Sequence, residues 1–185
     1  QEIEDGNYFF TDILKEGIRL NHSKRYTLSK PRNLTDEDRQ RQARDYYEKW
    51  FKSAHIFFLD YQENFKRGEK DSDFYSKAAF ELHQATERYY LTTLLVFTGY
   101  KPKTHDLEEL DFRAGRLDAR FKQVFPNKTE EEERLFGLLK KAYIDASYKL
   151  DYVIEQEELE YLAGRVELLR EITEEVCRKR LRRAD

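Results

Sequence analysis

Residues 78–110, with the sequence AAFELHQATERYYLTTLLVFTGYKPKTHDLEEL, decide the fold of this chain. Apolar residues recur at helical spacing up to Thr98, and Gly99 follows as a residue that readily takes the left-handed conformation that ends helices. A Pro-containing connection then leads to Thr104, which we expect to cap the next helix. The stretch therefore predicts two consecutive helices joined by a short turn.

The remaining chain continues this helical pattern. Thr35, followed by three acidic residues, predicts a helix start, and that helix is expected to reach Gly68. Thr129 and the acidic residues that follow it predict the start of a fourth helix. A turn near residues 153–154 then leads to a last helix, whose apolar stripe includes Cys177. With only 7 Gly and 3 Pro in 185 residues, the chain has too few turn residues for an all-β fold. We predict an all-α, antiparallel up-and-down bundle of four to six helices.

The first 30 residues do not fit this pattern. They combine an aromatic run with a Gly, and they suggest a short helix or extended piece followed by a strand-like segment to about Leu28. The sequence begins at Gln1 and contains no Met, so we expect a piece of a longer protein. On this interpretation residues 1–30 are a short extended tail that belongs to another domain, and residues 31–185 form the bundle.

Composition narrows the classes of function. A net charge of −3 gives no general basic surface for nucleic acids, so we expect no DNA partner. The single cysteine rules out an intrachain disulfide and a cysteine-based zinc cluster. No apolar run approaches the roughly 20 residues of a membrane helix, so we expect a cytoplasmic protein without a membrane partner.

Metal and cofactor motifs are missing from the sequence. The four histidines lie on separate segments without metal-ligand spacing, and there is no Gly-rich phosphate loop or nucleophile elbow. We therefore predict no metal, no cofactor and no catalytic residue.

Polar residues on the second predicted helix form the first candidate site. His83, Glu87 and Arg88 lie on adjoining parts of one helical face. In a binding site, Arg88 would pair with phosphate oxygens while His83 or Glu87 orients the ligand. The alternative is a Glu–Arg surface arrangement beside a half-buried histidine, which is common in helical bundles.

The start of the third predicted helix offers a second group. Lys103, His105 and Asp106 surround a helix N-terminus, where free backbone N–H groups attract anions and Lys103 would strengthen the attraction. Alternatively, Thr104 caps the helix and Asp106 complements its dipole. That alternative leaves Lys103 and His105 without a role.

Two tyrosines complete the candidate binding residues. Tyr148 and Tyr152 are expected to share a face at the end of the fourth helix, where they could stack on a base. The alternative is that they are core or dimer-interface aromatics whose hydroxyls reach water. The basic run at residues 178–183 suits the end of a helix dipole better than RNA binding.

These segments resemble the HEPN domain (higher eukaryotes and prokaryotes nucleotide-binding), in the variety that is fused to a bacterial nucleotidyltransferase. The resemblance extends over roughly residues 40–180 and is carried by residues 78–88, 99–107, 140–146 and 157–159. Residues 8–20 look like the closing segment of a nucleotidyltransferase domain. The resemblance therefore implies that residues 1–30 are the C-terminal remnant of such a domain.

The resemblance also implies a function. We expect a non-catalytic module that forms a homodimer and binds a nucleotide, or the substrate of an attached or partner nucleotidyltransferase. The alternative is a purely structural dimerisation or toxin–antitoxin interaction domain. Ribonucleases of this family carry an Arg followed four to six residues later by a His, and none of the four histidines here has such an Arg.

Overall fold

The computed structural model describes residues 13, 16, 17, 33–144 and 152–182. Its regular elements are α2 (Asp36–Gly68), α3 (Asp73–Thr98), α4 (Leu107–Leu117), the 3₁₀ helix η1 (Ala119–Gln123), α5 (Glu130–Lys141) and α7 (Gln156–Arg182). No strand occurs in the described residues, so the predicted all-α class is confirmed. The strand-like segment predicted within residues 1–30 and the stacking role of Tyr148 lie outside the described residues.

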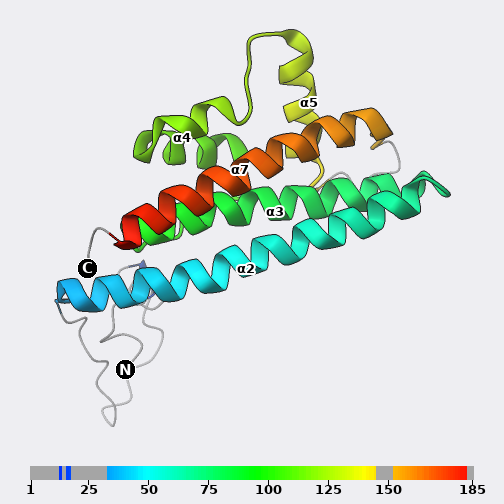
Figure 1. Cartoon of the computed structure of the whole chain (residues 1–185). Helices are drawn as coiled ribbons and strands as arrows, with labels where there is room; N and C mark the ends of the chain where they lie inside the picture. The colour runs from blue at the N-terminus through cyan, green and yellow to red at the C-terminus, as the bar shows by residue number, and fades with distance from the viewer. Residues whose placement is uncertain (1–12, 14–15, 18–32, 145–151, 183–185) are drawn as a thin grey trace.

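The long helices α2, α3 and α7 form the body of the bundle (Figure 1). α2 and α3 are antiparallel, whereas α7 runs in the same direction as α3. Contacts at both ends show this direction, because Tyr75 near the start of α3 bonds Gln156 at the start of α7, and Thr93 meets Cys177 near their ends. The intervening α4, η1 and α5 lie on the other side of the α3–α7 pair from α2 (Figure 1).

α3 is the central helix of the core. It packs against α2, α4, α5 and α7, and most of its residues from Ala78 to Val96 are buried. Aromatic side chains fill the contact with α2, where Phe51 meets Tyr89 and Phe65 meets Tyr75. A helix that is buried on most sides is expected to be apolar around its circumference. Any buried polar side chain on α3 therefore needs an explanation. None of the described helices has both the length and the apolar character needed to cross a membrane.

Most predicted helix ends are confirmed. Thr35 and Thr129 each form a capping box at the start of α2 and α5, and Gly99 ends α3 with φ 68°. The predicted cap of α4 is wrong, because the N-cap is Asp106, whose carboxylate accepts from the Glu108 N–H at 2.9 Å. The Thr104 hydroxyl instead accepts from the Asp106 N–H at 3.1 Å and forms a turn before the helix.

The end of the fourth helix also differs from the prediction. α5 ends at Lys141, and Tyr152 lies in the non-helical segment that precedes α7, so its placement in the fourth helix is wrong. The Tyr152 hydroxyl donates to the Leu138 carbonyl at 3.1 Å, which ties this segment back onto α5. The predicted turn near residues 153–154 is confirmed, since α7 begins two residues later.

Candidate functional site

Four side chains from three segments meet beside α3, and we call them the His–Glu–Tyr cluster. His83 and Glu87 stand one turn apart on α3, His105 comes from the turn before α4, and Tyr143 comes from the turn after α5. His83 is 1% exposed and Glu87 is 5% exposed, whereas the His105 side chain is 54% exposed. The cluster therefore connects the core with the surface.

Glu87 is held by His105. The Nδ1 atom of His105 lies 3.0 Å from Oε2 of Glu87, and because an ionised carboxylate only accepts, Nδ1 of His105 is the donor. A buried carboxylate without such a donor would be costly. His105 thus fixes Glu87 and covers it from the solvent side.

His83 has a defined hydrogen position and an unsatisfied atom. Its Nδ1 lies 3.0 Å from the carbonyl of Leu139, which can only accept, so Nδ1 carries hydrogen. Nε2 of the neutral ring is then an acceptor. It is buried without a hydrogen-bond partner among the described residues, 3.9 Å from Oε2 of Glu87. Burial lowers the pKa of His83 against the opposing effects of the Leu139 bond and the Glu87 charge, which favours the neutral ring. Two acceptors therefore face each other with no hydrogen between them.

Tyr143 provides an aromatic surface for the cluster. Its ring stacks with His105 at 4.7 Å and 18°, and with His83 at 5.3 Å and 23°. The sequence did not single out Tyr143 as part of a site, because its spacing in the segment after Thr129 also suits the apolar stripe of a helix. The one available signal was its position in residues 140–146, a segment that carries the family resemblance.

A groove of about 640 Å³ adjoins the cluster, between the start of α4 and the end of α5. It is lined by His105, Asp106, Leu107, Gly137, Lys140, Lys141, Tyr143 and Ile144. Lys140 pairs with Glu108 at 2.7 Å, whereas Lys141 is exposed and makes no ion pair with any described residue. The groove thus combines flat aromatic and aliphatic walls with two lysines. A second groove of about 540 Å³, where α2 begins and α3 ends, is lined by none of the described candidate residues.

The structure does not bring all the predicted site residues together. Arg88 packs against Trp50 and Phe57 of α2, because successive residues on a helix point about 100° apart and Glu87 already faces the groove side. Lys103 pairs with Glu16 at 2.7 Å. In the described part of the chain, no group of three or more His, Cys, Asp or Glu side chains is arranged to hold a metal ion.

The family of this chain follows from a comparison with known families. A family model described as the HEPN domain matches residues 47–176. The chain belongs to the HEPN domain family. The matched part of this HEPN domain starts within α2 and ends within the last turns of α7, so it contains the whole His–Glu–Tyr cluster. A comparison with curated proteins found no match.

Membership in the family supports a coarse function. At the family level, a HEPN domain is a module of the nucleotide-binding and dimerisation type. The geometry adds the residues of this HEPN domain that are suited to a ligand: a buried Nε2 atom of His83 that no described residue satisfies, an aromatic wall and two lysines.

Proposed function

We propose that this HEPN domain binds a nucleotide in the groove between α4 and α5 and does not itself catalyse a reaction. The observation that carries the proposal is the buried Nε2 of His83, which lies 3.9 Å from Oε2 of Glu87 and has no hydrogen-bond partner in the part of the chain that the structure describes. Buried polar atoms are nearly always satisfied, so an unsatisfied acceptor beside a groove favours a ligand that supplies the missing hydrogen.

A nucleotide has chemical groups that match this groove. A nucleobase offers a flat face for stacking on Tyr143 or His105 and N–H groups that Glu87 and His83 can accept. Its phosphates would lie toward Lys141, which has no acidic partner among the described residues. Since His105 lines the groove and covers Glu87, we expect its ring to bind the ligand directly.

The ligand is either a free nucleotide or the nucleotide-bearing substrate of an attached or partner nucleotidyltransferase. Both alternatives use the same groove. They differ in whether the groove binds a single nucleotide or a larger molecule that carries one. Titration with single nucleotides tests the first alternative, because a free nucleotide would bind the purified chain without any transferase.

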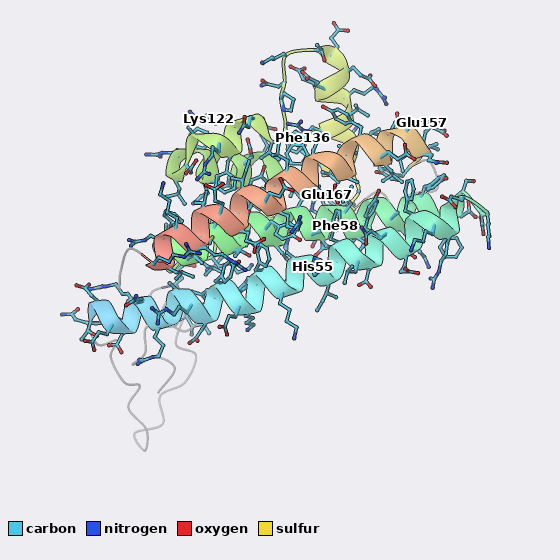
Figure 2. All side chains as sticks on the ribbon, in the orientation of Figure 1. His55, Phe58, Lys122, Phe136, Glu157 and Glu167 are labelled. Carbon is cyan, nitrogen blue, oxygen red and sulfur yellow. The ribbon has the colours of Figure 1, made fainter. Side chains whose placement is uncertain are left out.

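The experiment is a thermal-shift screen with the four nucleoside triphosphates, followed by calorimetric titration of the best one. A ligand that binds only the folded state raises the melting temperature. We expect the shift to disappear in His105→Ala and in Lys141→Ala. His55→Ala is the matched control, since His55 is an exposed histidine on α2 (Figure 2), away from the cluster. Full affinity in both groove variants would contradict the proposal.

We also propose that the domain forms a homodimer. Ile56 and Leu59 are 48% and 45% exposed and stand three residues apart on α2, so they lie on one side of the helix and present apolar surface to solvent. Sedimentation analysis of Ile56→Lys tests this proposal, and we expect a shift toward monomer. If the chain dimerises and binds no nucleotide, the purely structural role becomes the better explanation.

A further inference from the structure

Arg88 holds its guanidinium group against two aromatic rings of α2. Its Cζ atom lies 4.6 Å from the centroid of the Phe57 ring and 5.6 Å from that of the Trp50 ring. Within the described residues this side chain makes no ion pair and no hydrogen bond, and its Nε atom is buried without a partner. A guanidinium carries five N–H donors, and leaving a buried donor unpaired is costly.

The surroundings of Arg88 contain a second cation and a second polar donor. Nζ of Lys101 lies 5.6 Å from the Trp50 ring centroid and has no acidic partner in the described ranges. Gln84, one turn before Arg88 on the same side of α3, is only 8% exposed, and its amide bonds no described residue. Two positive charges therefore lie beside the Trp50 ring, the amide of Gln84 stands one turn from Arg88, and no carboxylate in the described ranges pairs with either cation.

We propose that Arg88, Lys101 and Gln84 form a phosphate-binding site on the α2 side of α3. The planar fork of an arginine matches two phosphate oxygens, and the stacked rings hold its direction. A phosphate dianion balances both cations, which a single carboxylate does not. This site differs from the groove of the proposed function, because Arg88 faces α2 whereas Glu87 pairs with His105. It does not depend on nucleotide binding in that groove.

Trp50 makes the test specific, because it is the single tryptophan of the chain. Inorganic phosphate is titrated at constant ionic strength while the Trp50 emission is recorded. We expect a saturable change in emission, since both cations beside the indole take part in binding. Arg88→Gln should weaken phosphate binding by about tenfold or more, and Lys101→Gln by about two- to fivefold.

Matched variants separate binding from folding. Arg67→Gln removes another arginine stacked on a ring, that of Phe74, and should leave phosphate affinity unchanged. Arg88→Lys keeps the charge and loses the fork, so it should melt near the parent and bind more weakly. AMP should compete with phosphate, whereas adenosine should not.

Three results would overturn this site. The first is an equal emission change on addition of chloride at the same ionic strength. The second is parental phosphate affinity in Arg88→Gln. The third is competition by adenosine that equals competition by AMP, since a phosphate site has no contact with the nucleoside alone.

Discussion

Nε2 of His83 lies 3.9 Å from Oε2 of Glu87, one helical turn away on α3, and the two side chains are 1% and 6% exposed. Both atoms are acceptors while His83 is neutral, and Nδ1 of His83 is already used by the Leu139 carbonyl. Protonation of His83 should therefore change the stability of the fold, and Nε2 of the neutral ring can accept a hydrogen bond from a ligand.

Stability should fall as the pH drops through the ordinary range of histidine. Burial lowers the pKa of His83 in the folded state, so between its folded and unfolded pKa values the unfolded chain binds more protons. The free energy of unfolding then rises with pH. The contribution of the neutral His83 ring to this free energy is lost as the pH falls below about 6.5. Urea unfolding from pH 7 to pH 5 measures this slope, and His83→Asn should reduce it by up to about one proton.

The control for this slope is His55→Asn, a change at an exposed position on α2 (Figure 2). It should keep the parental slope between pH 7 and pH 5. An unchanged slope in His83→Asn would show that the buried ring does not contribute to the pH dependence.

The end of α3 depends on the backbone conformation of Gly99. Its φ is 68°, and a Cβ atom there would meet nothing within 4 Å, so the cost of Gly99→Ala is conformational rather than steric. We expect a loss of about 1 kcal/mol in the free energy of unfolding. Gly164→Ala, on an exposed and uncrowded turn of α7, should instead stabilise the chain by about 0.5–1 kcal/mol. Two changes of the same sign in denaturant unfolding would contradict this account.

Cys177 should resist thiol reagents until the bundle opens. It is 0% exposed, and burial raises the pKa of its thiol to about 12, so almost no thiolate is present near neutral pH. Because the chain has one cysteine, a colorimetric thiol assay reports this site alone. We expect slow labelling of the folded chain and complete labelling in guanidinium chloride. Rapid labelling without denaturant would mean that α7 separates readily from α3.

The contact between α3 and α4 depends on one buried hydroxyl. Tyr90 donates to Oδ1 of Asp111 at 2.7 Å, and burial raises the pKa of Asp111. Tyr90→Phe removes the donor and keeps the ring, so Asp111 loses its partner at a cost of about 1–3 kcal/mol. Tyr90→Phe combined with Asp111→Asn should recover part of this loss, since the half-buried side chain at position 111 is then uncharged. Chemical denaturation of the parent and of these two variants provides the comparison.

Much of the fold could be predicted from the sequence, because helix starts and ends depend on residues within one turn of each other. Thr35 and Thr129 with their acidic followers predict helix starts, and Gly99 predicts a helix end, because each of these effects acts within one turn of the chain. The cap of α4 was predicted at Thr104 and lies at Asp106, because both side chains can bond the nearby backbone and sequence alone does not rank them.

By itself, the sequence determined an all-helical bundle, most helix ends and the presence of polar residues on the central helix. Only the tertiary structure decided which polar residues meet. His105 and Tyr143 reach Glu87 and His83 through the packing of α4 and α5 on α3, whereas Arg88 turns toward α2. The physical reason is that helix formation depends on neighbours three or four residues apart, while a site depends on how whole helices pack and on which way each side chain then points.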